Sequence, residues 1–206
     1  MDNILKNKNV LITGATGGVG VELCTQFKEN GANLFITSKT NNKIQTLANE
    51  FECEYINSDF NLGIKELTTS IRNTIGTIDI LVNCAGVFIS DELNELTLDN
   101  FDTIFNVNVK APFALMKEFS QDMKKNKWGR IINIGSNSAY MGISENTLYT
   151  ASKHAILGLS RSLQQELKVH GIRTYCFSPG GMQTPMGKAI NEEEYISEKI
   201  FDCFSS

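Results

Sequence analysis

Short apolar runs alternate with helical patterns along this chain. The apolar runs predict six strands, at residues 10–12, 34–37, 54–56, 78–82, 130–134 and 173–177. Between them, apolar residues recur three or four positions apart and predict helices at residues 20–29, 43–51, 64–75, 98–105, 111–125 and 148–169. Strands that are apolar on both faces and alternate with helices favour an α/β fold of the Rossmann type, a doubly wound parallel sheet with helices on both faces.

Glycines and polar residues come directly after several of these strands. The stretch "TGATGGVG" occupies residues 13–20, "NCAG" occupies residues 83–86, and Ser136, Pro179 and Gly180 follow two later strands. In a parallel sheet, ligands bind at the edge formed by the carboxyl ends of the strands. A strand, a glycine turn and a helix start present free amides to a phosphate, although a tight strand–helix connection alone would also explain such glycines.

The end of the second strand indicates which dinucleotide would bind. A site for NAD places an acidic side chain there, against the ribose 2′-hydroxyl. This chain has Ser38 and Lys39 instead, and a cation beside a hydroxyl suits a 2′-phosphate. We therefore favour NADP(H) and keep NAD(H) as the alternative, in which Lys39 is an ordinary surface lysine. After the third strand, Asp59 is a candidate for the adenine end of the site or for the cap of the next helix.

Tyr149 and Lys153 lie four residues apart on the longest predicted helix and therefore share one of its faces. Such a pair is common by chance and would then be a surface pair. Two other residues support a functional role for this pair. Ser136 lies 13 positions before Tyr149, and Asn108 follows the helix predicted at residues 98–105.

Together these motifs resemble the compact, single-domain branch of the short-chain dehydrogenase/reductase family. Read through Gly14, Gly17 and Gly20, the glycines have the spacing of the family's extended, epimerase-like relatives. The length of the chain and its later motifs favour the compact branch, with one domain over residues 1–206. The resemblance spans about residues 8–185 and rests on Thr13, Gly14, Gly18, Val19, Gly20, Asn83, Ala85, Gly86, Asn108, Ser136, Tyr149, Lys153, Pro179, Gly180 and Thr184.

The resemblance implies a catalytic tetrad of Asn108, Ser136, Tyr149 and Lys153. Tyr149 would be the general acid, and the base in the reverse reaction. Lys153 would lower the pKa of that phenol and bond the nicotinamide ribose. Ser136 would hydrogen-bond the substrate oxygen, and Asn108 would hold a water that links Lys153 to solvent.

The resemblance also implies which residues hold the cofactor. The pyrophosphate would lie against the glycine turn, the adenosine against the ends of the second to fourth strands, and the nicotinamide against the end of the sixth strand. These residues are Thr13, Gly14, Thr16, Gly18, Val19, Gly20, Ser38, Lys39, Asp59, Asn83 (as a brace of the sheet), Ala85, Gly86, Tyr149, Lys153, Pro179, Gly180 and Thr184.

The implied function is hydride transfer between the nicotinamide cofactor and a ketone or secondary alcohol. Residues 87–95, 139–147 and 182–190 would form the substrate walls, and their composition indicates a small, partly apolar carbonyl compound. A cofactor-binding regulatory or scaffold protein with little turnover is one alternative. A nucleotide-sugar epimerase or dehydratase is a second, for which the chain leaves no room for a substrate domain.

Composition and length argue against several classes of partner and bear on localisation and assembly. A net charge of −4 gives no reason to expect nucleic acid or an anionic membrane as partner, and no apolar run approaches the roughly 18 residues that span a bilayer. We expect a cytoplasmic enzyme, without a metal, that forms a homodimer or tetramer through the helices at residues 111–125 and 148–169. Compact family members end with one more helix and strand; residues 192–204 fit the helix, and we expect the last strand to be missing.

Overall fold

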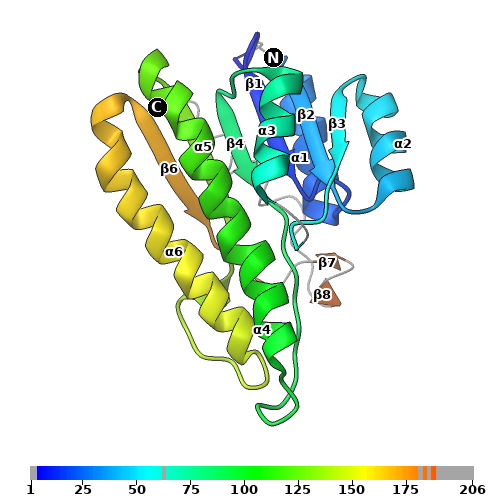
Figure 1. The fold of residues 1–206 in the computed structure, drawn as a ribbon, viewed down its shortest axis with the longest axis vertical. Coiled ribbons are helices and arrows are strands. Elements are labelled where there is room, and N and C mark those ends of the chain that lie inside the picture. Colours follow the sequence, from blue (N-terminus) through cyan, green and yellow to red (C-terminus); the bar gives the residue numbers. More distant parts are fainter. Residues whose placement is uncertain (1–3, 62–63, 181–182, 185–186, 189–206) are drawn as a thin grey trace.

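A six-stranded parallel sheet in the order β3-β2-β1-β4-β5-β6 forms the centre of the computed structural model (Figure 1). The structure describes residues 4–61, 64–180, 183–184 and 187–188. The strands are β1 (Asn9–Thr13), β2 (Asn33–Ser38), β3 (Glu54–Asn57), β4 (Ile80–Asn83), β5 (Gly129–Ile134) and β6 (Ile172–Phe177). A separate antiparallel pair consists of β7 (Gln183–Thr184) and β8 (Gly187–Lys188). The predicted α/β fold is confirmed.

Helices cover both faces of this sheet, as the apolar strands require. α1 (Gly18–Glu29) and α2 (Asn41–Phe51) pack on one face. α3 (Ile64–Ile75), α5 (Ala111–Asn126) and α6 (Thr147–Leu167) pack on the other, and α4 (Leu98–Phe105) leads into α5. Each helix begins and ends within three residues of the range predicted for it.

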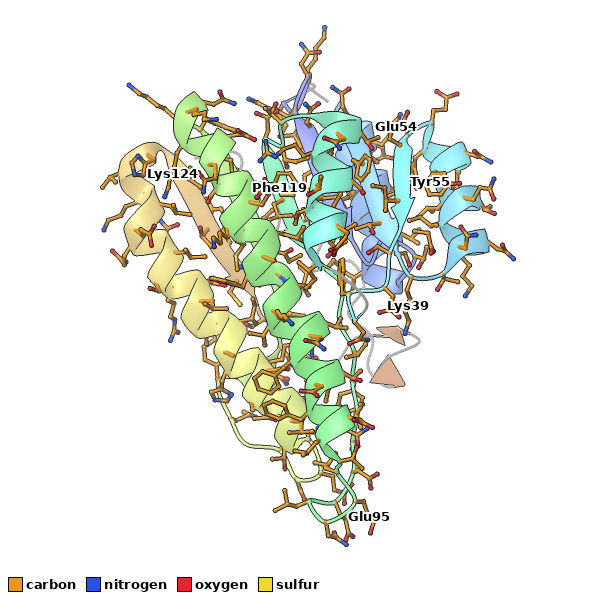
Figure 2. The ribbon with its side chains drawn as sticks, in the orientation of Figure 1. Lys39, Glu54, Tyr55, Glu95, Phe119 and Lys124 are labelled. Carbon is orange, nitrogen blue, oxygen red and sulfur yellow. The ribbon has the colours of Figure 1, made fainter. Side chains whose placement is uncertain are left out.

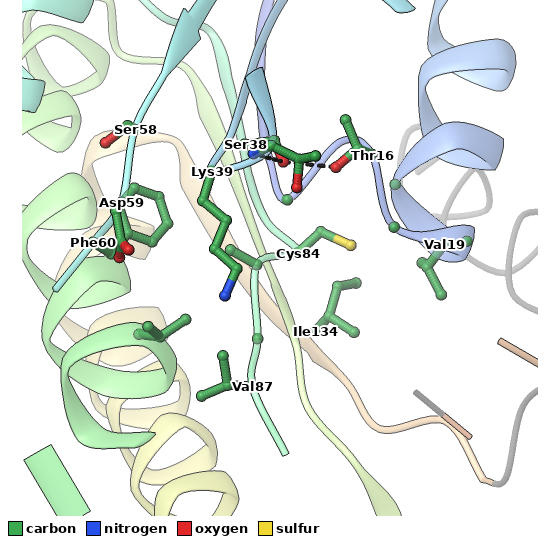
Figure 3. Close-up of a pocket in the computed structure, with 18 of the residues that line it drawn as sticks. Thr16, Val19, Ser38, Lys39, Ser58, Asp59, Phe60, Cys84, Val87 and Ile134 are labelled. Atoms are coloured by element: carbon green, nitrogen blue, oxygen red, sulfur yellow. Dashed lines mark hydrogen bonds between the residues drawn. The ribbon is translucent and has the colours of Figure 1, made fainter. Parts of the chain in front are cut away.

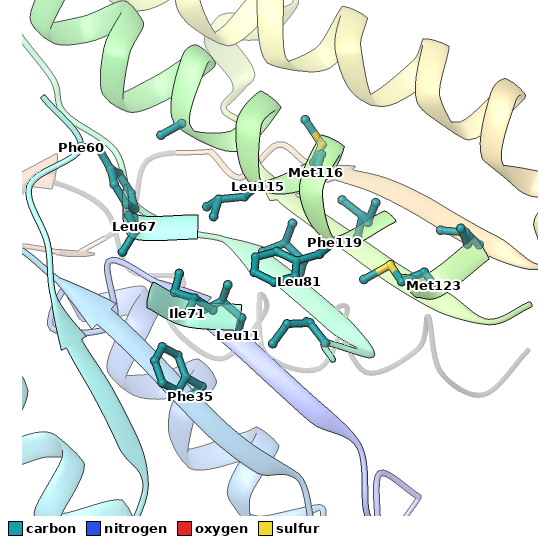
Figure 4. Close-up of a cluster of buried hydrophobic side chains, with 14 of the residues drawn as sticks. Leu11, Phe35, Phe60, Leu67, Ile71, Leu81, Leu115, Met116, Phe119 and Met123 are labelled. Atoms are coloured by element: carbon teal, nitrogen blue, oxygen red, sulfur yellow. The ribbon is translucent and has the colours of Figure 1, made fainter. Parts of the chain in front are cut away.

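Side chains of β1 alternate between the two hydrophobic clusters, one on each face of the sheet. Leu11 points into the cluster formed with Leu81 and Phe119 under α3 and α5 (Figure 4). Its neighbours Val10 and Ile12 belong to the opposite cluster, under α1 and α2. Because successive side chains of a strand point to opposite faces, a continuous apolar run is what a strand covered on both sides needs.

The connection between α4 and α5 differs from the prediction. The sequence pattern predicts two helices with a break between them, but Asn106–Lys110 forms a turn of π-helix that joins α4 to α5 without a loop. A π-helical turn inserts an extra residue into the helix and is frequent at functional sites. Here it lies where Asn108 is buried.

The order of the strands reverses at β1 and β4, so their carboxyl ends open onto a crevice where ligands bind in folds of this kind. β6 forms one edge of the sheet in the described part of the chain, and the helix predicted at residues 192–204 lies outside it. None of the helices within the described ranges is both long and apolar enough to cross a membrane.

Candidate active site

Two glycines let the start of α1 pack closely against the ends of the strands. Gly14 has a φ of +65°, and a Cβ there would lie 2.6 Å from the Cα of Ala85. A Cβ on Gly20 would clash with the carbonyl oxygen of Gly14 and lie 2.7 Å from the Cα of Ala15. Both positions therefore require glycine for the turn to form.

The first turn of α1 has its amides available to a ligand. Gly17 is the N-cap, no side chain caps the helix, and no acidic residue lies in the first turn. Free amides and the positive end of the helix dipole attract an anion. This turn consequently fits the pyrophosphate of a dinucleotide.

A cavity of about 360 Å³ runs from this turn along the carboxyl ends of the strands (Figure 3). It reaches from the end of β2 to Tyr149 and Lys153 on α6. Of the residues predicted to hold a cofactor, those that line it are Gly14, Thr16, Gly18, Val19, Gly20, Ser38, Lys39, Asp59, Ala85, Gly86, Tyr149 and Lys153.

Val87, predicted as part of a substrate wall, also lines the cavity. Further lining residues were not identified from the sequence, among them Thr40, Lys43, Phe60, Asn61, Cys84, Val107, Ile134 and Gly135. Lys43 had a signal in the sequence, because it lies four positions after Lys39 at the start of a predicted helix. The apolar members had none, because a buried residue that also borders a cavity looks like any other core residue.

The outer end of the cavity carries two lysines. Lys39 and Lys43 are exposed, and neither forms an ion pair within the described ranges. Next to them the hydroxyls of Thr16 and Ser38 lie 2.6 Å apart (Figure 3). Two cations and paired hydroxyls fit a 2′-phosphate better than a 2′-hydroxyl. Asp59 also borders this end, and its Oδ1 accepts a hydrogen bond from the amide of Asn61 at 2.9 Å.

Thr13 and Asn83 support the site from beneath and do not line the cavity. Thr13 Oγ1 accepts hydrogen bonds from the amides of Cys84 and Ala85 at 3.1 and 3.0 Å. Asn83 Nδ2 donates to Asn133 Oδ1 at 2.7 Å, which joins the end of β4 to β5. Thr13 therefore positions the turn that follows β4, a bracing position like that expected of Asn83.

Tyr149 and Lys153 border the inner end of the cavity together. The Tyr149 hydroxyl is hydrogen-bonded to Ser136, and its ring meets the ring of Phe88 edge-on, with 4.9 Å between centroids. Lys153 Nζ donates a 2.8 Å hydrogen bond to the carbonyl oxygen of Ile134 and lies 5.5 Å from the centroid of the Tyr149 ring. The structure thus brings together three of the four predicted catalytic side chains.

Burial dominates the proton affinities of this pair. It raises the pKa of the Tyr149 phenol above its ordinary value, and the hydrogen bond with Ser136 offsets part of that rise. Burial lowers the pKa of Lys153 to about 8, against the opposing influence of Cys84 and Cys176. Lys153 is not among the causes of this shift in the protein alone, where desolvation of the phenol outweighs its neighbours. That Lys153 lowers the pKa of Tyr149 stays a prediction.

Asn108 uses its side-chain amide to fasten three elements. Its Oδ1 accepts from the amide of Val87 at 2.9 Å, and its Nδ2 donates to the carbonyl of Val87 and to Ser152 Oγ, both at 3.0 Å. A Cβ on Gly86 would lie 3.6 Å from Asn108 Oδ1 and 3.9 Å from Lys153 Nζ. Asn108 and Lys153 therefore border the same small space beside Gly86, which suits the expected water.

The predicted nicotinamide residues after β6 are only partly described. The carbonyl of Pro179 accepts a 3.0 Å hydrogen bond from the amide of Asn137, next to Ser136, and Gly180 is exposed. Neither lines the cavity. The backbone of Thr184 lies in β7, and its side chain lies outside the described part. The described residues hold no group of three or more histidine, cysteine or acidic side chains arranged for a metal.

The sequence as a whole matches the short chain dehydrogenase family over residues 8–195. The chain belongs to the short-chain dehydrogenase/reductase family. It is an NAD(P)-dependent oxidoreductase that acts on alcohol or carbonyl groups.

Relatives of this dehydrogenase cover most of its length. A 3-oxoacyl-[acyl-carrier-protein] reductase of Rickettsia bellii is 32% identical over 198 residues, 95% of this chain and 82% of the relative. The (+)-borneol dehydrogenase 2 of Salvia officinalis is 32% identical over 208 residues, 97% of this chain and 74% of the relative.

Two solved structures of the family resemble this fold. A metagenomic short-chain oxidoreductase in complex with NADP has a TM-score of 0.88 at 27% identity, covering 98% of this chain and 93% of its own. A gluconate 5-dehydrogenase of Burkholderia cenocepacia, in complex with NADP and tartrate, has a TM-score of 0.79 at 26% identity, covering 87% and 74%.

Proposed function

We propose that this enzyme uses NADP(H) to interconvert a ketone and a secondary alcohol, with Tyr149 as the proton donor and acceptor. The proposal rests on a cavity that has Lys39 and Lys43 at its outer end and the Tyr149–Lys153 pair at its inner end. The glycine turn at the start of α1 fits the pyrophosphate between them.

NADPH, when bound, supplies the hydride for reduction of the carbonyl carbon. Tyr149 gives the proton that the substrate oxygen needs, and it takes a proton back in alcohol oxidation. Ser136, hydrogen-bonded to the Tyr149 hydroxyl, holds the substrate oxygen beside that hydroxyl and stabilises the charge that develops on it. The raised pKa of Tyr149 favours the protonated phenol, the form that reduction requires.

Lys153 and Asn108 support this proton transfer. Lys153, protonated in most molecules at pH 7, keeps a cation 5.5 Å from the centroid of the Tyr149 ring and so favours the phenolate left behind. A water beside Gly86, between Asn108 Oδ1 and Lys153 Nζ, would return a proton from solvent.

Calorimetric titration of NADPH and NADH into the double variant Lys39→Ala/Lys43→Ala tests the cofactor assignment. We expect NADPH affinity to fall by about 10- to 100-fold, because each lysine forms a charge-assisted contact to the phosphate. NADH affinity should stay within about twofold of its wild-type value on the same argument, because NADH lacks that phosphate. Lys117→Ala, an exposed lysine on α5, is the matched control. Equal loss for both cofactors would reject the assignment.

Turnover is tested by following NADPH consumption with a panel of ketones. A chain that binds NADPH and turns over none of them would support the regulatory alternative. Tyr149→Phe then serves as the internal control, because it should abolish any activity found.

We also propose a cytoplasmic homodimer or tetramer. Phe101, Phe113 and Leu98 are apolar side chains on α4 and α5 with exposed fractions of 42%, 47% and 83%, and exposed apolar patches often mark interfaces. The four cysteines that the structure describes are free thiols, as a reducing compartment would keep them. Light scattering on the wild type and on Phe113→Asp measures the assembly.

A further inference from the structure

Two loops next to Tyr149 carry negative charge and apolar surface but no basic residue. The first is the segment 87–96 after β4, and the second is the segment 139–146 before α6. They contain Asp91, Glu92, Glu95 and Glu145, all exposed, and neither has a lysine, arginine or histidine. We refer to these two segments together as the substrate rim.

The rim segments are joined to each other and to the catalytic tyrosine. The amide of Asp91 donates a 2.8 Å hydrogen bond to the carbonyl oxygen of Glu145, so the two loops meet. Phe88 lies three residues before Asp91 and contacts the ring of Tyr149. Three residues of chain span at most about 11 Å, which keeps the Asp91 carboxylate near the reacting centre.

The apolar side chains of the rim are unusually exposed. Phe88 is 40% exposed, and Tyr140, Met141 and Ile143 are 56%, 54% and 37% exposed. Exposed apolar groups beside a catalytic residue mark a surface that a ligand covers. They indicate a substrate with an apolar body.

Within the described residues, no cation forms an ion pair with a carboxylate of the rim. Arg161 on α6 lies outside both loops, 5.8 Å from the centroid of the Tyr140 ring. Lys153 is buried and engaged with Ile134. Lys39 and Lys43 lie at the far end of the cavity, where the proposed 2′-phosphate would occupy them.

We infer that the substrate rim selects ketones that are apolar and either uncharged or cationic, and that it excludes carboxylates. Four carboxylates that form no ion pair within the described part of the chain repel an anion on approach and attract a cation, while the aromatic rings accept an apolar or ammonium-bearing group. Charge of one sign around a site also discriminates by repulsion. The inference rests on the proposed function. It separates this enzyme from the Burkholderia cenocepacia relative, which is seen with the dicarboxylate tartrate.

Three acetophenones that carry substituents of different charge at the same ring position test the inference. They are 4-acetylbenzoate, 4-methylacetophenone and 4-acetyl-N,N,N-trimethylanilinium, titrated calorimetrically into the enzyme saturated with NADP⁺. A ketone and NADP⁺ form no product, so binding is measured without turnover. Saturation with NADP⁺ is measured first, so failure of cofactor binding would reject the proposed function before the inference is tested.

We expect the cation to bind at least about tenfold tighter than the anion at low salt, with the neutral ketone between them. The cation-to-anion ratio should shrink in high salt, because the rim charges are exposed. In Asp91→Asn/Glu92→Gln/Glu145→Gln the ratio should fall to within about twofold of one, if these charges set it.

The control variant removes three carboxylates at the opposite end of the molecule. Glu29→Gln/Glu50→Gln/Glu54→Gln has the same net charge as the rim variant, and Glu54 lies at the other end from Glu95 of the rim (Figure 2). It should keep the wild-type ratio. Anion binding as tight as cation binding, an unchanged ratio in the rim variant, or no binding of any of the three ketones would each overturn the inference.

Discussion

Lys153 Nζ and the carbonyl oxygen of Ile134 form a 2.8 Å hydrogen bond between α6 and the end of β5. The bond holds a buried amine 5.5 Å from the centroid of the Tyr149 ring. An ammonium is costly to bury, and the pKa of Lys153 is accordingly lowered from 10.5 to about 8. The active site therefore includes a cation that opposes the stability of the fold.

Replacing this lysine should stabilise the protein while destroying activity. The unfolded chain binds the extra proton between about pH 8 and pH 10.5, so stability rises with pH across that window and is lowest below it. At pH 7, Lys153→Met should gain about 2 kcal/mol in free energy of unfolding. Removing the buried ammonium, whose pKa is shifted by burial, contributes a gain of about 3 kcal/mol. Leaving the carbonyl of Ile134 without its hydrogen-bond donor costs about 1 kcal/mol.

Urea unfolding at pH 7 and near pH 10.5 measures the effect. At the higher pH the gain should vanish, because the wild-type lysine is then neutral in the folded state as well. Lys117→Met, on the exposed face of α5, should show no such dependence. A Lys153→Met protein that is less stable than wild type at pH 7 would contradict the explanation.

Tyr149→Phe should lower kcat by about 10²- to 10⁴-fold in both directions, since it removes the proton donor. NADPH affinity and thermal stability should change little, because the ring that contacts Phe88 is retained. Because burial raises the pKa of Tyr149, alcohol oxidation by the wild type should speed up with pH through the neutral range, whereas ketone reduction should not require high pH.

Initial rates between pH 6 and pH 10 in both directions check this. The pH dependence of oxidation should disappear from any residual activity of Tyr149→Phe. An oxidation rate that is already constant at pH 7 would show that bound cofactor or substrate reverses the direction of the pKa shift.

Local patterns in the sequence were sufficient for the elements of the fold. Strands buried on both faces carry unbroken apolar runs, and the stop of α1 at Asn30 and Gly31 follows the usual cap, with Gly31 at a φ of +86°. The turn of π-helix around Asn108 could not be foreseen, because it is fixed by contacts with Val87 and Ser152 far away in sequence.

The features of the site likewise divide into those that the sequence could predict and those that depend on the folded chain. The motif positions identified Tyr149, Lys153 and the glycine turn, because their spacing follows from the helix and the strand that carry them. The net direction of the Tyr149 pKa shift could not be predicted from the sequence, because it depends on how deeply the folded chain buries the phenol. Lys43 was missed although it follows Lys39 by four positions on a predicted helix, and the folded chain shows that both border one cavity.

The glycines of the first turn should differ in tolerance. Gly17→Ser should fold and keep NADPH affinity within about threefold, because serine is a preferred N-cap and its Cβ meets only the Gly14 carbonyl oxygen, at 3.3 Å. Gly20→Ala should lose cofactor binding, because its Cβ has no room beside Gly14 and Ala15. Gly18→Val should also lose cofactor binding, since Gly18 borders the cavity at the helix start.

Thermal unfolding and NADPH titration of the three variants measure these effects. Equal loss of affinity in all three would instead favour the interpretation through Gly14, Gly17 and Gly20, the spacing of the epimerase-like relatives.

Gly86→Ala should slow turnover without harming the fold. The new methyl group would lie 3.6 Å from Asn108 Oδ1 and 3.9 Å from Lys153 Nζ, both ordinary contact distances. It would nevertheless occupy the space proposed for the water that returns a proton to the Tyr149–Lys153 pair, so kcat should fall by about tenfold or more.

Asn108→Ala is the comparison for Gly86→Ala, because it removes the same contact to that water together with the bonds to Val87. It should lower kcat and also cost about 2–3 kcal/mol in free energy of unfolding, since the amide and carbonyl of Val87 lose their partner. Urea unfolding separates the two variants, and a kcat of Gly86→Ala equal to wild type would remove the water from the mechanism.

The affinity of both variants for NADPH is measured as well, because Gly86 also lines the cavity. A loss confined to NADPH affinity would assign Gly86 to cofactor binding and leave proton return to another route.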